Sequence, residues 1–470
     1  SAIVDGVRAG TDAPHAIADA LAVHKAAFEA AGGYLAERAA DLDDLRDRAV
    51  AAYLGLPMPG IPTPGHPFVL IAKDLAPADT ASLDPTEVVA LVTESGGPTS
   101  HTAILARALG LPAVVNCLSA LSIPEGTMVC VDGSLGTIEV GVDQSVVEQV
   151  RHRQELARQR AARYTGPGRT SDGTSVPLLA NVGSAKDLLD GDFGAEGVGL
   201  LRSELLYLDR VVAPSIDEQV AAYAEVFAAM PGRKVVVRTL DAGADKPLPF
   251  LNQSDEPNPA LGVRGLRLSR QRPELLRTQL SAIAQAAADT HANVWVMAPM
   301  VATVAEAAAF VGECRVAGLP KAGVMVEVPA AALAARALLT VVDFLSVGTN
   351  DLSQYLFAAD RQCGDLADLL DTYQPVLLRL IGEVAAAGRA AGKSVSVCGE
   401  AAADPGLALV LAGVGVTSLS MSTRSIPAVR AALADHTMDE CRRLADLAMS
   451  SPDAATVRRA LAQHRQDPPH

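Results

Sequence analysis

Apolar positions are spaced differently in successive parts of the chain, and each spacing predicts a different kind of element. Residues 1–55 carry alanine-rich apolar faces at helical spacing, around 16–31 and 35–54, separated by a glycine pair. We therefore expect this region to be helical. The Pro/Gly-rich run 56–67 follows and predicts a linker.

Short apolar runs of strand length come next, at 68–72, 88–92 and 128–131. They predict a small mixed α/β domain over 56–142. The charged run DQSVVEQVRHRQELARQRAARY then ends at the breaker TGPGR, which predicts a linker helix and hinge over 143–168.

The rest of the chain, 169–470, repeats one pattern, in which short apolar runs alternate with helix-like segments. Runs that are almost continuously apolar are typical of strands buried on both faces, as in parallel sheets. An open doubly wound sheet is the alternative, but no glycine-rich dinucleotide fingerprint follows the first strand. Eight strands favour an α/β fold with a (β/α)8 TIM barrel, its strands at 176–180, 197–201, 235–239, 294–298, 323–326, 344–347, 394–397 and 418–421.

Polar residues stand at or just after the C-terminal ends of these predicted strands. In a (β/α)8 barrel those ends form the active face, so we expect the side chains to meet there. They are Asn181, Arg202, Arg238, Glu327, Asn350, Asp351, Cys398 and Glu400.

Composition narrows the function. With 39 basic against 54 acidic residues the net charge is −15, and aromatic residues make up 3%, which argues against nucleic-acid binding. The six cysteines form no CxxC pair, so neither a zinc site nor a disulfide framework is predicted. No apolar run reaches the roughly 20 residues of a membrane span, and the N-terminus lacks a secretion-signal pattern, so we expect a cytoplasmic protein without membrane insertion.

Two carboxylates follow consecutive strands, Glu327 in VMVEVP and Asp351 in VGTNDLSQY. Mg²⁺ commonly takes one or two protein carboxylates together with substrate oxygens and water. These two residues are therefore candidate Mg²⁺ ligands.

Arginines are expected near the same carboxylates. The fork of a guanidinium matches phosphate and carboxylate groups, so Arg202, Arg238 and Arg361 predict an anionic, phosphorylated substrate. Arg264 and Lys246 lie in the long loop after the third strand and are weaker candidates. The alternative is that these charges form internal salt bridges that close the top of the barrel.

One histidine has an unusual setting. His101 lies between the pair Gly96 and Gly97 and a predicted apolar helix, where helix N–H groups would stabilise a phosphoryl group on the imidazole. The alternative is a buried or capping histidine. Cys398 is either a small buried hydrophobe or, beside an anionic enol, a proton donor.

Seven segments, distributed over essentially the whole chain, match the motifs of one known family. They are GGPTSHTAILARALGLPAVV, GAEGVGLLRSELLYLDR, VVVRTLDAGADKPLP, NPALGVRGLR, GVMVEVPAAA, FLSVGTNDLSQY and VCGEAA. In this order they resemble enzyme I of the bacterial sugar phosphotransferase system, the phosphoenolpyruvate-protein phosphotransferase family of PEP-utilising enzymes.

The resemblance implies phosphoenolpyruvate (PEP) as donor, pyruvate as product, Mg²⁺ as cofactor and phosphorylation of His101. It further implies transfer to the phosphocarrier protein HPr on a helical subdomain, a swivelling histidine domain, and a homodimer formed through the barrel. The implied roles are metal binding for Glu327 and Asp351, phosphate binding for Arg202, Arg238 and Arg361, substrate contact for Asn350, and proton donation for Cys398.

The chain departs from the family pattern in three places. It starts partway through the HPr-binding subdomain, so 1–55 is expected to form only part of that subdomain. The segment TYQPVLLRLIGEV is a few residues shorter, and Ala244 stands where the family usually has glycine. Pyruvate phosphate dikinase or PEP synthase shares the histidine domain and barrel, but needs a large ATP-binding domain before the histidine. A non-catalytic scaffold that keeps the fold is the other alternative.

Overall fold

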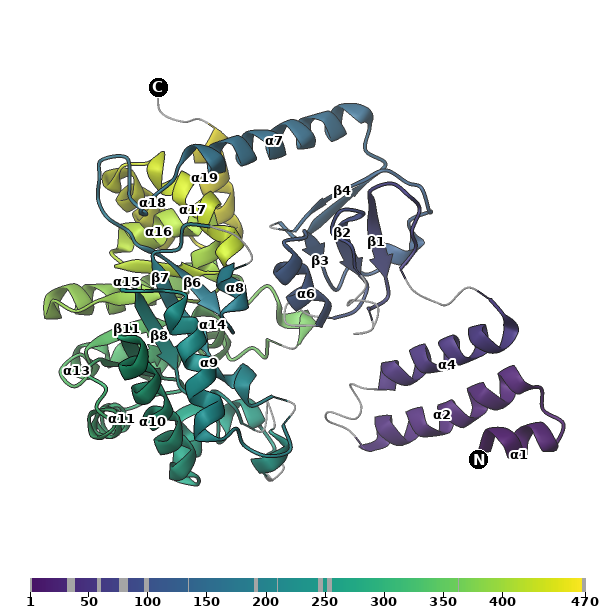
Figure 1. The fold of residues 1–470 in the computed structure, drawn as a ribbon. Coiled ribbons are helices and arrows are strands. Elements are labelled where there is room, and N and C mark those ends of the chain that lie inside the picture. Colours follow the sequence, from purple (N-terminus) through teal and green to yellow (C-terminus); the bar gives the residue numbers. More distant parts are fainter. Residues whose placement is uncertain are drawn as a thin grey trace. The chain divides into compact units, whose positions relative to one another are not determined.

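The chain forms two compact units in the computed structural model (Figure 1). The structure describes residues 2–31, 39–56, 61–75, 83–96, 101–133, 135–189, 193–208, 210–243, 248–251, 256–361 and 363–466. One unit comprises Ser1–Arg151 with Arg361–Ala367, and the other comprises His152–Asp360 with Asp368–His470.

The first unit begins with helices, as predicted. These are α1 (Ala2–Arg8), α2 (Ala13–Ala31) and α4 (Ala39–Leu54). Helix α2 packs against both α1 and α4. The start of the predicted apolar face at 35–54 lies outside the described residues.

Two small sheets follow in the same unit. Strands β1 (Phe68–Ala72), β2 (Val88–Thr93) and β3 (Ala113–Val114) are parallel, in that order, and β4 (Val129–Asp132) pairs antiparallel with β5 (Thr137–Val140). Helix α6 (His101–Leu109) precedes β3, the short helix η1 (Ala120–Ser122) follows it, and α7 (Gln144–Arg163) follows β5. The mixed α/β fold is thus as predicted, and α7 lies within the region that was predicted as a linker helix and hinge.

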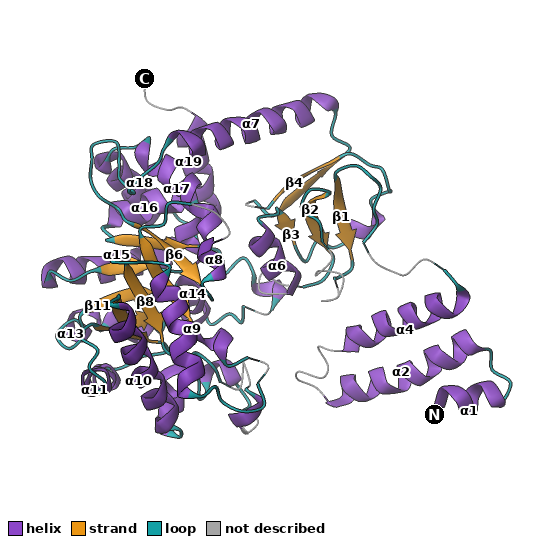
Figure 2. Ribbon diagram, viewed as in Figure 1, coloured by secondary structure: helices purple, strands orange, loops and turns teal. Residues whose placement is uncertain are grey.

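The second unit is a closed barrel of eight parallel strands in chain order, which confirms the predicted fold (Figure 2). Each strand begins within two residues of its predicted start. The strands are β6 (Leu178–Val182), β7 (Gly197–Arg202), β8 (Lys234–Arg238), β9 (Asn293–Ala298), β10 (Ala322–Val326), β11 (Phe344–Val347), β12 (Val395–Val397) and β13 (Ser418–Met421).

Helices surround these strands on the outside of the barrel (Figure 1). The α-helices are α8 (Lys186–Leu189), α9 (Ile216–Ala228), α10 (Pro273–Thr290), α11 (Val304–Val316), α12 (Pro329–Leu333), α13 (Ala335–Leu338), α14 (Thr349–Phe357), α15 (Pro375–Ala391), α16 (Pro405–Val414), α17 (Ile426–Ala434), α18 (Met438–Ser450) and α19 (Ala454–Gln466). The 3₁₀ helices after β6 are η2 (Ser203–Leu206), η3 (Pro249–Leu251), η4 (Pro259–Leu261), η5 (Gly265–Arg270), η6 (Gly364–Leu366), η7 (Glu400–Ala403) and η8 (Thr423–Ser425), of which η6 belongs to the first unit.

Residues of strands β7 to β11 alternate between two cores. On β11, Leu345 and Val347 join the large core between strands and helices, whereas Phe344 joins a smaller core with Met297 and Met325. Because side chains of a strand point alternately to opposite faces, the smaller core fills the inside of the barrel. The barrel is therefore packed, and its chemistry is confined to the rim.

None of the described helices is long and apolar enough to cross a membrane.

Candidate active site

Three buried carboxylates meet at the C-terminal rim of the barrel. Glu327 directly follows β10, Asp351 lies in the first turn of α14, and Asp241 follows β8. Their exposed fractions are 1%, 6% and 1%. Buried carboxylates need positive charge or hydrogen-bond donors to remain ionised.

Two buried arginines connect these carboxylates. Arg238, the last residue of β8, donates to Glu204 at 2.5 Å and lies 3.2 Å from Asp241. Arg264 lies 3.1 Å from Asp241 and 3.2 Å from Asp351. In the structure, both arginines therefore form the internal salt bridges that the sequence analysis gave as the alternative.

The surroundings of Glu327 favour the protonated form of its carboxyl group. Burial, together with the nearby charges of Asp351 and Asp241, raises the pKa of Glu327 to about 8, while Arg238 and Arg264 oppose the shift. Its Oε1 accepts a hydrogen bond of 2.5 Å from the backbone N–H of Met300. The carboxyl group is thus fixed in place. Binding of a cation would favour its ionised form and release the proton.

The donor set fits a hard divalent cation that is also bound by substrate. The rim carries an excess of carboxylates, and oxygen ligands are those that Mg²⁺ prefers. Among the described residues no three His, Cys, Asp or Glu side chains gather so as to enclose a metal by themselves. Glu327 and Asp351 would therefore hold the ion from one side, with substrate and water oxygens completing its shell.

Asn350, in the first turn of α14, and Cys398, directly after β12, lie at the same rim. The side-chain oxygen of Asn350 accepts from the backbone N–H of Glu400 at 3.2 Å. Cys398 is buried, and its carbonyl oxygen accepts from the side chain of Asn181 at 2.8 Å. The first contact joins α14 to the segment after β12, and the second joins β6 to the same segment. Both hold these elements together at the rim.

The remaining predicted site residues have different positions. Arg202 ends β7 with an exposed side chain, and Arg361 belongs by its contacts to the first unit. Lys246 lies outside the described residues. His101 is the first residue of α6, but its side chain lies outside the described part of the structure; its neighbour Thr102 donates to Asp74 at 3.1 Å.

The sequence analysis missed two residues of this network, Glu204 and Asp241. Both lie within segments that were quoted for the resemblance, three residues or fewer beyond a strand end. The signal that would have found them is the need of the buried Arg238 for acidic partners within reach of its guanidinium.

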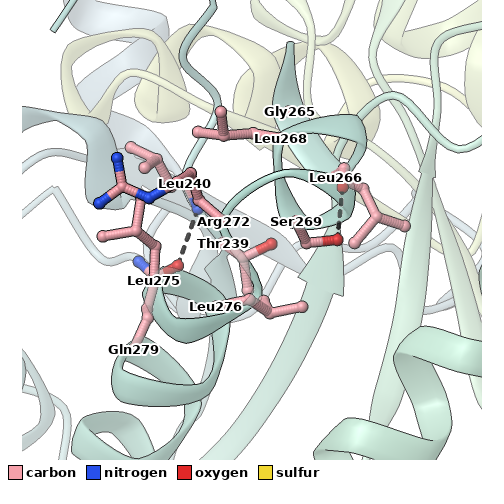
Figure 3. A pocket seen from close by; sticks show the side chains of 10 residues that line it. All are labelled: Thr239, Leu240, Gly265, Leu266, Leu268, Ser269, Arg272, Leu275, Leu276 and Gln279. Carbon is pink, nitrogen blue, oxygen red and sulfur yellow. Dashed lines mark hydrogen bonds between the residues drawn. The ribbon is translucent and has the colours of Figure 1, made fainter. Parts of the chain in front are cut away.

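A separate small pocket lies between the residues that follow β8, η5 and the start of α10 (Figure 3). It is lined by leucines and by Gln279, whose Oε1 accepts from the N–H of Leu240 at 2.9 Å. None of the rim carboxylates lines it, so we assign the chemistry to the carboxylate and arginine network.

A parallel barrel with a carboxylate and arginine rim, preceded by a small α/β domain, is the architecture of a PEP-utilising enzyme. The family model for the PEP-binding domain of these enzymes matches residues 157–438, and that for their mobile domain matches residues 64–136. The chain belongs to the phosphoenolpyruvate-protein phosphotransferase family, as the sequence motifs predicted.

Relatives named phosphoenolpyruvate-protein phosphotransferase establish this membership. The Streptomyces coelicolor protein is 57% identical over 447 residues, which cover 94% of this chain and 80% of the relative. The Haloferax volcanii protein is 41% identical over 462 residues, with the same two coverages. The Staphylococcus carnosus protein is 39% identical over 438 residues, 88% of this chain and 75% of the relative.

Proposed function

We propose that this phosphotransferase moves the phosphoryl group of PEP to His101 and then to a histidine of HPr, the first step of the sugar phosphotransferase system. The observation that carries the proposal is the buried network at the barrel rim, in which Arg238 and Arg264 pair with Glu204, Asp241 and Asp351. The match of a PEP-binding family model to the barrel supports it.

In this proposal the arginines bind the phosphate of PEP. Arg238 and Arg264 present fixed guanidinium groups, and Arg202 and Arg361 add further positive charge. Asn350 contacts the substrate, and Lys246 is a further candidate contact. Glu327 and Asp351 hold Mg²⁺, which supplies charge neutralisation for the transferred phosphoryl group.

His101 attacks phosphorus and becomes phosphohistidine. Its place at the start of α6 lets the helix N-terminus stabilise negative charge on the phosphoryl group. The enolate of pyruvate that remains then takes a proton at C3 from Cys398.

Several further parts of the proposal rest on family membership. The linker at 143–168 acts as a hinge, so that His101 reaches first the barrel rim and then HPr. HPr binds the helical region 1–55, the barrel forms the homodimer, and the protein acts in the cytoplasm.

Incubation with ³²P-labelled PEP and Mg²⁺ tests the proposal. We expect an acid-labile, alkali-stable label that is lost in His101→Ala and passes to added HPr. A label that persists in His101→Ala, or one that requires ATP as in a dikinase, would overturn the proposal. No label at all would favour the non-catalytic scaffold.

A further inference from the structure

Three serines form a row inside the barrel, one on each of three neighbouring strands. In the strand register Ser346 of β11 is level with Ser396 of β12, and Ser396 is level with Ser418 of β13. All three side chains are buried, with exposed fractions of 0%, 8% and 4%. Their strand neighbours, such as Val397 and Leu419, join the outer core, so the serines point inward.

This row makes one side of the barrel interior polar. The opposite side, on β7 to β10, is filled by Leu200, Val236, Met297 and Met325. A hydroxyl group in such an interior is costly unless it forms a hydrogen bond. A row of buried hydroxyl groups on one side only therefore needs an explanation. We look for it in the neighbouring residue Cys398.

Cys398 lies directly above the row. It follows Ser396 by two residues and so shares its inward face. The Cys398 N–H donates to the carbonyl oxygen of Val347 at 3.0 Å, and its thiol donates to the same oxygen at 3.5 Å. Ser346 directly precedes Val347 and is level with Ser396, so its inward-facing side chain lies one inward position below the thiol, diagonal to it on β11.

Within the row, the Ser396 hydroxyl donates to Ser346 Oγ at 3.0 Å. Accepting this bond leaves the Ser346 hydroxyl proton available for another acceptor. The buried Ser418 hydroxyl, in contrast, has no hydrogen-bond partner among the described residues. The two outer members of the row therefore differ in their hydrogen bonding although their burial is similar.

We propose that Ser346 is a positioning residue for proton transfer, whose hydroxyl, oriented by Ser396, holds the Cys398 sulfur in line with the substrate. This inference rests on the proposed function, in which Cys398 is the donor. In the step, the S–H bond breaks and a C3–H bond forms, the enolate becomes the keto group of pyruvate, and the negative charge passes to sulfur. A hydroxyl that donates to sulfur stabilises that charge as it develops.

The electrostatics agree with this role. Burial raises the pKa of the Cys398 thiol, and the nearby Glu327 adds to the shift, whereas the hydrogen bond with Ser346 and the charges of Arg238 and Arg202 lower it. The thiol thus remains protonated until substrate arrives, as a donor must.

The test uses the stereochemistry of protonation, which a merely structural role would not change. The full-length protein reacts with Mg²⁺ and PEP stereospecifically deuterated at C3, in tritiated water, and the chirality of the pyruvate methyl group is determined. We expect chiral pyruvate from the wild type. Ser346→Ala should give largely racemic pyruvate and form keto-pyruvate about tenfold more slowly in a single turnover, with an unchanged KM for PEP.

Matched variants complete the experiment. Ser418→Ala removes an equally buried hydroxyl of the same row and should behave like the wild type, and Ser346→Thr, which keeps a hydroxyl, should restore chirality. Labelling of His101 by PEP shows that each variant is folded. If Ser346→Ala does not fold, Ser396→Ala replaces it, with a smaller expected loss of chirality.

The outcomes separate this inference from the proposed function. If Cys398→Ala gives racemic pyruvate while Ser346→Ala stays fully chiral at wild-type rate, the inference is wrong and the donor role of Cys398 stands. If Cys398→Ala itself gives chiral pyruvate, the thiol is not the donor and both fail. Equal loss in Ser346→Ala and Ser418→Ala would also overturn the inference, because it would indicate a general packing effect.

Discussion

At the scale of single residues, the rim of the barrel is organised by unequal charge. Four buried carboxyl groups, Glu204, Asp241, Glu327 and Asp351, surround two buried arginines, Arg238 and Arg264. Among the described residues these four acidic groups face two cations, and the proton that burial favours on Glu327 lowers the negative charge of the rim. In the proposed function, this charge attracts Mg²⁺ and the arginines bind the phosphate of PEP.

Asp241 is the carboxylate that both arginines share. Asp241→Asn should lower the free energy of unfolding by about 2 kcal/mol, because it weakens charge-assisted bonds to both arginines, although Arg238 keeps Glu204 and Arg264 keeps Asp351. Urea denaturation measures the change. The control Asp439→Asn removes an exposed carboxylate that pairs with Arg442 at 2.6 Å and should cost less than about 1 kcal/mol. Equal losses in the two variants would contradict this account.

The raised pKa of Glu327 predicts a pH dependence of stability. Its ordinary pKa is 4.5 and its folded value is about 8, so between these values the folded state keeps a proton that the unfolded state has lost. Metal-free protein should therefore become less stable as pH rises from 5 to 8, by at most about 1.4 kcal/mol per pH unit.

Urea unfolding in EDTA across this range tests the dependence. Glu327→Gln cannot ionise, and its stability should fall less steeply with pH than that of the wild type. Parallel curves for the two proteins would show that Glu327 has an ordinary pKa in the fold.

At the scale of elements, the site depends on how strand ends meet helix starts. Gly399 follows β12 and packs against the first residue of α14, which carries Asn350 and Asp351. A Cβ atom at Gly399 would lie 1.8 Å from Thr349 Oγ1 and 2.6 Å from the Thr349 nitrogen. Only glycine allows this approach of the two segments.

Gly399→Ala should therefore displace the start of α14 and with it Asp351. We expect the concentrations of Mg²⁺ and PEP for half-maximal pyruvate formation to rise about tenfold or more, because small misplacements of binding groups are costly. Gly312→Ala is the control, since Gly312 lies in α11 with open space around its Cβ position. This control should leave both concentrations unchanged. Unchanged concentrations in Gly399→Ala would contradict the packing argument.

The same scale explains what the sequence could predict. The eight barrel strands were predicted because each is a short apolar run buried on both faces, whereas β3 has two residues and β5 is largely exposed, so neither shows that pattern. The salt bridges of Arg264 were harder to foresee. Arg264 reaches the rim through a bridge with Gly243, at which a Cβ atom would lie 2.3 Å from the Arg264 side chain. Such long-range pairing leaves no local periodicity in the sequence.

At the scale of the whole molecule, the two units are joined through α7. The division between them falls within this helix, after Arg151, and α7, which is described throughout, has no buried residue. Its C-terminal end is fixed to the barrel unit, where Arg160 and Tyr164 both donate to Asp435. A hinge of the proposed kind would thus be anchored to the barrel unit at its C-terminal end.

Asp435→Ala tests the anchored end. Without this carboxylate the last turn of α7 loses both of its bonds to the barrel unit, so His101 would sample more unproductive orientations. We expect phosphorylation of His101 in rapid-quench experiments to slow several-fold, while PEP binding at the rim is unchanged. Asp439→Ala removes an exposed carboxylate that pairs with Arg442 of its own helix, and should have no effect. An unchanged rate of His101 phosphorylation in Asp435→Ala would show that the bonds to Asp435 do not orient the histidine. Weaker binding of PEP in this variant would show instead that the substitution perturbs the barrel.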